Sequence, residues 1–121
     1  MVNVREVFWS MVRNPELLIN YVRELGLDIK DLCGDEVGRF RCPPGQGDDF
    51  RSRFFVISYL YLKLLSQEVR ELGGYNVPIE GVRELVSDII TDMRLYNAPP
   101  ELFEAIIKLV RELLRLLPDV A

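Results

Sequence analysis

Hydrophobic residues recur at three- and four-residue steps along most of the chain, which is the period of helices that bury one face. Within residues 4–25 this period predicts two short helices, or one helix kinked near Asn14, because Pro15 suits the first turn of a helix. Gly26 then suits a left-handed cap at the end. Residues 50–72 contain neither Gly nor Pro and are apolar nearly all round their middle, which predicts a central helix buried by several neighbours.

Two further helices are predicted in the second half of the chain. The first begins at Pro78 and carries apolar residues at helical spacing as far as Met93. The second covers residues 101–117, after the pair Pro99 and Pro100.

The helical period fails in one long segment, residues 27–49, which gathers Gly, Pro and Asp and has about one helical turn near its start. Loops of this length are uncommon in compact domains and are usually functional or mobile. The other connections are short, which is typical of antiparallel neighbours. A chain of 121 residues that is 49% hydrophobic is long enough for one core. We therefore expect an all-α protein: a single domain, residues 1–121, built as a four- or five-helix antiparallel bundle with one long loop.

The last predicted helix has more apolar surface than one core-facing side requires, because its polar stripe is narrow. A domain of this size has few elements that could cover such a helix, so we expect part of its surface to contact another chain. The residues expected at this interface are Leu102, Phe103, Ile106, Val110, Leu113 and Leu117.

The absence of histidine from the sequence excludes several kinds of catalytic site. The chain can build no imidazole general base, no Ser–His or Cys–His pair and no metal site that contains histidine. We expect no catalytic residues, no metal and no cofactor. The leading hypothesis is a non-enzymatic helical protein–protein interaction module, an accessory or oligomeric subunit that binds a second copy of itself or another protein.

Charge and hydropathy restrict where the protein acts. The net charge of −4 argues against binding of nucleic acid over the whole surface, although it is compatible with a local basic patch. The longest apolar run, residues 54–65, is shorter than the roughly 20 residues of a membrane-spanning helix and is interrupted by Lys63. The N-terminus lacks the pattern of a secretory signal, so we expect a cytoplasmic protein with no membrane segment. Twelve Arg against three Lys are compatible with a thermophilic source.

Cys33 and Cys42 are the only cysteines, and both lie in the long loop. Two sulfur atoms without histidine cannot complete a tetrahedral zinc site unless carboxylates or a second chain supply the other ligands. One expectation is a disulfide that closes the loop, which would stabilise the fold by about 3 kcal/mol in the chain-entropy model. The other expectation is two free thiols, the usual state in the cytosol outside hyperthermophiles.

Arginine and phenylalanine alternate where the long loop meets the central helix. Guanidinium groups beside aromatic rings suit phosphate contacts and base stacking, as in proteins that hold single-stranded nucleic acid. The alternative function is therefore a nucleic-acid-associated helical subunit that uses Arg39, Arg41, Arg51, Arg53 and Phe40 within residues 39–54. The competing interpretation is that these arginines form local ion pairs with Asp35, Glu36, Asp48 and Asp49.

Four acidic residues lie at successive four-residue steps and would form one ridge along a helix: Glu80, Glu84, Asp88 and Asp92. Together with Glu68 and Glu71, the ridge resembles the all-helical nucleoside triphosphate pyrophosphohydrolases, whose facing helices present paired carboxylates to magnesium. The second pair here, Glu84 and Asp88, is four residues apart where that family has three. The resemblance implies a third hypothesis, a carboxylate–metal enzyme that acts on nucleotides. The other interpretation is a solvated face neutralised by Arg83, Arg94 and neighbouring helices.

Overall fold

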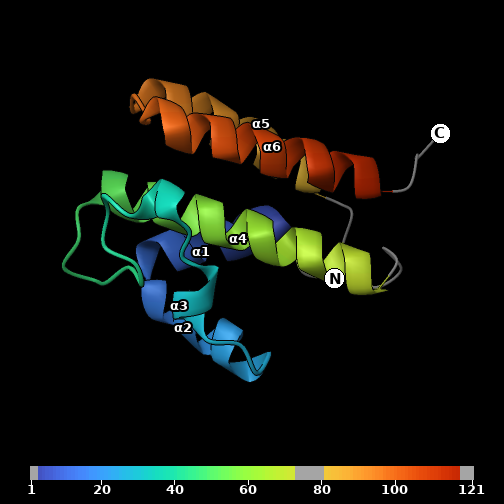
Figure 1. Ribbon diagram of the computed structural model, residues 1–121, viewed down its shortest axis with the longest axis horizontal. Coiled ribbons are helices and arrows are strands. Elements are labelled where there is room, and N and C mark those ends of the chain that lie inside the picture. Colours follow the sequence, from blue (N-terminus) through green and yellow to red (C-terminus); the bar gives the residue numbers. More distant parts are fainter. Residues whose placement is uncertain (1–2, 73–80, 118–121) are drawn as a thin grey trace.

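The computed structural model describes residues 3–72 and 81–117, and their regular structure is entirely helical (Figure 1). The elements are α1 (Val4–Arg13), α2 (Pro15–Glu24), α3 (Ile29–Leu32), the 3₁₀ turn η1 (Asp35–Val37), α4 (Phe50–Leu72), α5 (Val82–Leu95) and α6 (Pro100–Leu116). The all-α class is confirmed. The described residues form six α-helices: five that correspond to the predicted helices, and α3, which is the single turn expected near the start of the long segment.

The core lies among four helices that contact one another in a ring. α4 packs against α1 and α6, and α5 packs against the other sides of the same two helices. Every residue of α4 from Phe54 to Leu62 is buried, which confirms the prediction of a central helix apolar on all sides. Successive long helices alternate in direction, as expected of an antiparallel bundle, but the most extensive contact joins α4 and α6, which run parallel (Figure 1).

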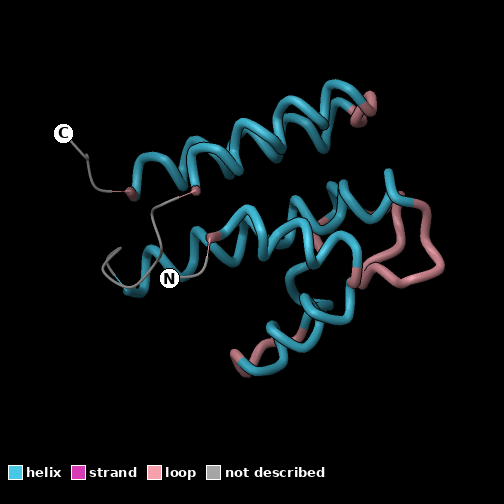
Figure 2. Tube along the Cα trace, turned by 180° about the vertical axis from the view of Figure 1, so that it is seen from behind, coloured by secondary structure: helices cyan, strands magenta, loops and turns pink. Residues whose placement is uncertain are grey.

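α1 and α2 are two separate helices that diverge from Asn14, as Figures 1 and 2 both show. The side chain of Asn3 begins α1 by accepting a hydrogen bond from the backbone N–H of Arg5 at 2.9 Å. Asn14 has extended backbone angles, and Pro15 occupies the first turn of α2. The predicted break is therefore confirmed. Gly26, with a φ of +76°, follows the end of α2, as predicted for a left-handed cap.

The segment between α3 and α4 is held to the body of the protein at several points. The sulfur atoms of Cys33 and Cys42 lie at disulfide distance and their Cα atoms are 6.1 Å apart, which agrees with the first of the two expectations for this pair. Within the loop that they close, Val37 is fully buried and the ring of Phe40 packs edge-on against that of Phe55. The peptide bond before Pro43 is cis.

α5 begins at Val82, later than the predicted start at Pro78, which lies outside the described residues. Gly81 precedes the helix with a φ of +90°, a conformation that only glycine adopts readily. α6 matches the predicted last helix and begins one residue earlier, at Pro100. In the described part of the chain, no helix combines the length and the apolar character that crossing a membrane requires.

Candidate functional site

The interface predicted on α6 belongs largely to the protein's own core. Leu102, Ile106 and Leu113 have no exposed surface, and Val110 and Leu117 are at most 6% exposed. Only Phe103 is half-buried, with the guanidinium of Arg94 5.7 Å from the centre of its ring. The expectation that these side chains meet another chain therefore needs correction, because α4 and α5 already cover the apolar arc that seemed to need a partner.

In the part of the chain that the structure describes, four large apolar side chains are exposed, and two of them lie in α2 or at its C-terminal end. Leu17 is 44% exposed and Leu25 is 45% exposed, whereas Leu18 and Val22 of the same helix are buried. The other two are Phe50 and Leu95. The three- and four-residue period of residues 4–25 gives both leucines, Leu17 and Leu18, to the apolar face of the helix, so sequence reasoning did not separate them. The signal that it missed was the width of the apolar face of α2, which is the criterion that had been applied to α6.

A groove of about 550 Å³ is lined by residues of α1 and α2. These two helices diverge from each other (Figure 1). Its apolar floor consists of Val7 and Met11 from α1 and Leu17 and Tyr21 from α2. The remaining lining residues are polar or acidic: Glu6, Ser10, Asn20 and Glu24. The lining residues lie between positions 6 and 11 of α1 and between positions 17 and 24 of α2, so at about 1.5 Å per residue the groove extends over at most about two helical turns.

Two of the four arginines proposed to bind nucleic acid are occupied within the protein. Arg51 donates from Nε to the carbonyl oxygen of Tyr96 at 2.7 Å and from Nη2 to that of Asn97 at 3.0 Å. Its guanidinium also lies 4.9 Å from the centre of the Phe55 ring. Arg53 donates to the carbonyl oxygens of Val12 and Asp48. These two side chains join the loop and the start of α4 to distant parts of the chain.

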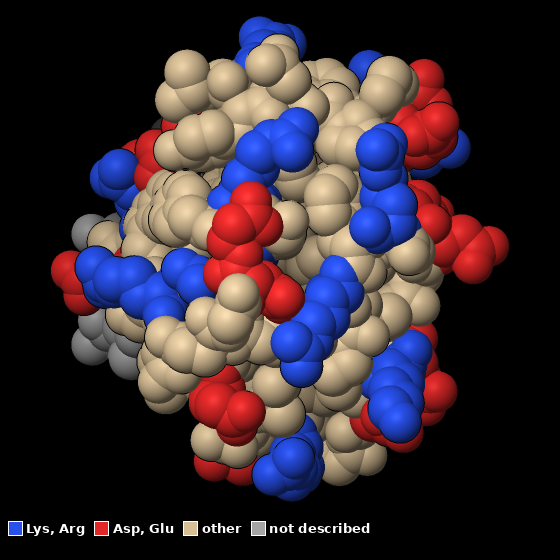
Figure 3. Space-filling model, turned by 90° about the vertical axis from the view of Figure 1, so that its left-hand side faces the viewer, with Lys and Arg blue, Asp and Glu red and all other residues tan. Residues whose placement is uncertain are grey.

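The other two arginines make fewer contacts with the rest of the protein. Arg41 has 68% of its side chain exposed and forms an ion pair with Asp48 at 3.7 Å. This is the only ion pair of the predicted local set in the described residues. The guanidinium of Arg39 lies 5.8 Å from the centre of the ring of Phe40, which is itself half-buried. Figure 3 shows the side of the molecule that carries this loop: its basic side chains are separated by uncharged surface and acidic side chains lie among them.

The acidic ridge does not assemble a metal site in the part of the chain that the structure describes. Asp88 accepts a hydrogen bond from Nε of Arg5 at 2.9 Å, and Glu84 is exposed to solvent. Burial, and then the neighbouring charge of Asp88, raise the pKa of Asp92. Glu80 lies outside the described residues. Among residues 3–72 and 81–117 no three His, Cys, Asp or Glu side chains come close enough to hold a metal ion together.

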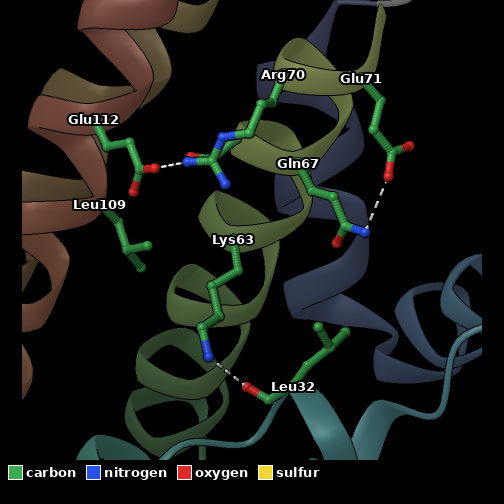
Figure 4. A pocket seen from close by; sticks show the side chains of 8 residues that line it. Leu32, Lys63, Gln67, Arg70, Glu71, Leu109 and Glu112 are labelled. Carbon is green, nitrogen blue, oxygen red and sulfur yellow. Dashed lines mark hydrogen bonds and ion pairs between the residues drawn. The ribbon is translucent and has the colours of Figure 1, made fainter.

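A second hollow of about 440 Å³ lies between α3, α4 and α6 (Figure 4). Its charged side chains form hydrogen bonds or ion pairs with other groups of the protein. Lys63 donates from Nζ to the carbonyl oxygen of Leu32 at 3.0 Å, and Arg70 forms an ion pair with Glu112. The hydroxyl of Ser66 lines this hollow and is buried without a hydrogen-bond partner. Two cations and two carboxylates line it in all, so its formal charge is balanced.

Beneath this hollow, Tyr59 links α4 to η1. Its hydroxyl donates to a carboxylate oxygen of Glu36 at 2.9 Å, and Nζ of Lys63 lies 4.5 Å from the centre of its ring. Burial, and then the bond to Glu36, raise the pKa of Tyr59. The pKa of Glu36 is lowered, first by a hydrogen bond from its own backbone and then by the one from Tyr59. These contacts fix the loop against α4.

The two hollows differ in whether their side chains already have partners within the protein. The charged groups around Lys63 and Arg70 are already paired with groups of the protein, whereas the groove between α1 and α2 exposes an apolar floor to water. The chain matches no protein-family model, no curated protein and no solved structure. Its function must therefore be inferred from this geometry.

Proposed function

We propose that this protein is a non-enzymatic helical interaction module, a small accessory subunit that binds another protein chain in the groove between α1 and α2. The observation that carries the proposal is the apolar floor of this groove, in which Leu17 remains 44% exposed beside Met11 and Tyr21. Apolar side chains gathered in a hollow and rimmed by polar ones mark binding surfaces more often than scattered exposed leucines do.

The residues of the floor suit protein recognition in different ways. The tyrosine provides a large contact area and a polar tip, and such residues are enriched at the energetic centre of interfaces. A methionine adapts its shape to a partner because its side chain is unbranched and flexible. Burying the exposed leucine beneath a partner would add the hydrophobic term that drives most protein association.

A photocrosslinking experiment tests the proposal. A photoreactive amino acid replaces Leu17 in one variant and Leu95, an exposed leucine of α5, in a matched control. Both variants are irradiated in the cells that make the protein. We expect a discrete adduct from position 17 and none of comparable yield from position 95. An adduct of twice 14.0 kDa would identify a second copy as the partner, and any other mass a different protein. Equal yields from both positions, or no adduct from position 17, would contradict the proposal.

The alternative function, binding of nucleic acid by residues 39–54, has narrower support. Arg39 and Arg41 are exposed, and the first lies near an aromatic ring. The occupied side chains of Arg51 and Arg53 leave this pair as the only basic groups of the segment suited to phosphate. The alternative predicts salt-dependent binding of single-stranded RNA or DNA that is lost when both Arg39 and Arg41 are replaced by alanine. Unchanged binding by this double variant would dispose of it.

The third hypothesis, a carboxylate–metal enzyme, predicts that magnesium stabilises the protein and that Glu84→Ala removes the effect. The contacts of the ridge favour a structural role, since Asp88 is paired with Arg5 across α5 and α1. An unchanged melting temperature at millimolar magnesium would exclude this hypothesis.

A further inference from the structure

The shape and the lining residues of the groove between α1 and α2 also indicate which kind of partner it binds. This inference rests on the proposed function. The two helices diverge from Asn14 like the sides of a wedge (Figure 1), and residues of both line the groove, so it has two helical walls. Helices pack with their axes 8–10 Å apart, and a third helix laid in such a wedge contacts both walls at once. The stretches of the two walls that line the groove are about 8 Å and about 11 Å long, which matches about two turns of a partner helix.

The floor determines which residues such a helix would present. Val7 and Met11 are one turn apart on α1, and Leu17 and Tyr21 are one turn apart on α2. A partner helix with apolar residues at three- and four-residue steps would present an apolar stripe one or two residues wide. This stripe would pack against the apolar pair of α1 and the apolar pair of α2. This is the way in which amphipathic helices dock into hydrophobic grooves.

The polar and acidic residues that line the groove determine the charge of the partner. Glu6 and Glu24 line opposite walls, both are exposed, and neither forms an ion pair with a described residue. No Lys or Arg lines the groove. Beside the groove, Nη2 of Arg13 donates to the hydroxyl of the lining residue Ser10 at 3.5 Å. An occupant with basic residues on both edges of its apolar stripe would therefore find a carboxylate on each wall.

A second copy of the same groove does not fit this pattern. Two such grooves laid face to face would place the carboxylates of Glu6 and Glu24 of one copy near those of the other, and like charges across an interface oppose association. We infer that the groove between α1 and α2 binds a short amphipathic helix of another protein, with an apolar stripe flanked on both sides by Lys or Arg.

The test is a selection from a displayed library of helical peptides of 14 residues. Peptides are selected for binding to the full-length protein and counter-selected against Leu17→Ser, which removes the apolar side chain without changing the charge of the groove. We expect the enriched peptides to share apolar residues at helical spacing and Lys or Arg at the flanking positions. Their affinity should fall as salt is added, because the flanking contacts are exposed to solvent.

Matched variants then separate the two kinds of contact. For an enriched peptide, Leu17→Ser should raise the Kd by about tenfold or more, as expected of a central apolar anchor. Replacing Glu6 and Glu24 together by Gln should raise the Kd several-fold at low salt and much less at high salt. Leu95→Ser and Glu101→Gln, the same changes at exposed positions away from the groove, should leave the Kd unchanged.

The outcomes distinguish this inference from the proposed function. Enriched peptides without basic residues, or a Kd indifferent to the two Glu→Gln changes, would overturn the assigned charge of the partner while leaving the groove as a binding surface. Failure to enrich any peptide that prefers the wild-type protein over Leu17→Ser would overturn the helical partner. The proposed function would survive either result if position 17 still gives its crosslinked adduct in cells.

Discussion

Replacing Leu113 by alanine tests whether the apolar arc of α6 is core or interface. Leu113 is fully buried within the chain. Leu→Ala changes at such sites destabilise by about 3–5 kcal/mol, because they remove buried methyl groups and leave a cavity. The entropy of unfolding for 121 residues is about 0.25 kcal/mol per degree at roughly 2.1 cal/mol/K per residue, so a loss of about 3 kcal/mol lowers the melting temperature by about 12 °C.

The matched control is Leu95→Ala, at a leucine that is 67% exposed and lies at the end of α5. Exposed substitutions of this kind change stability by about 0.5 kcal/mol or less, which corresponds to about 2 °C. Thermal unfolding followed by circular dichroism at several protein concentrations measures both variants. If Leu113 were at an interface between chains, its effect would depend on protein concentration and the solution mass would fall. A loss of stability no larger than that of Leu95→Ala would refute the placement of α6 in the core.

Three further predictions concern single features of the fold. Gly81→Ala should destabilise by about 1–2 kcal/mol in a denaturant titration, because a φ of +90° is unfavourable for alanine. Reduction of the Cys33–Cys42 disulfide, a separation of nine residues, should lower the free energy of unfolding by about 3 kcal/mol; two thiols that react before reduction would contradict this. Burial, and then the charge of Glu71, raise the pKa of Glu68, so its ionised form is unfavourable in the fold and stability falls as the pH rises through that pKa. Glu68→Gln should therefore raise the melting temperature relative to wild type at pH 7, and the difference should disappear at pH 3.

The parts of the fold that could be predicted depend on signals between residues close in sequence. The bounds of α4 follow from an uninterrupted run without Gly or Pro, and the structure places them at Phe50 and Leu72, as predicted. The break between α1 and α2 follows from Asn14 and Pro15, which favour a helix start wherever they occur. Such signals act within one or two turns, so they do not depend on the arrangement of the whole chain.

The parts that could not be predicted depend on which elements meet in space. The composition of α6 shows that it is widely apolar, but not that α4 would lie along it and bury Leu113. Leu17 and Leu18 are identical residues next to each other, and the packing of one face of α2 against α1, α3 and α4 leaves the first exposed and the second buried. An apolar helix face that is wider than one neighbouring helix can cover thus indicates either a second neighbour within the chain or a partner outside it.

The candidate nucleic-acid site illustrates the same limit for polar residues. An arginine beside a phenylalanine has the same sequence pattern whether its guanidinium binds phosphate or a carbonyl oxygen of its own chain. Arg51 binds the carbonyl oxygen of Tyr96, 45 positions away, and nothing local to either residue indicates this contact. The unpaired carboxylates of Glu6 and Glu24 were likewise unremarkable in the sequence and became informative only as two sides of one groove.

The most direct test of the central claim is native mass spectrometry of the protein isolated from the cells that make it. Three forms would be compared: the wild type, Leu17→Ser and the control Leu95→Ser. If the groove between α1 and α2 binds a partner chain, the wild type and the control should appear in a complex heavier than 14.0 kDa, and Leu17→Ser should appear as the free chain. A complex that persists undiminished in Leu17→Ser, or free chains in all three samples, would contradict the claim.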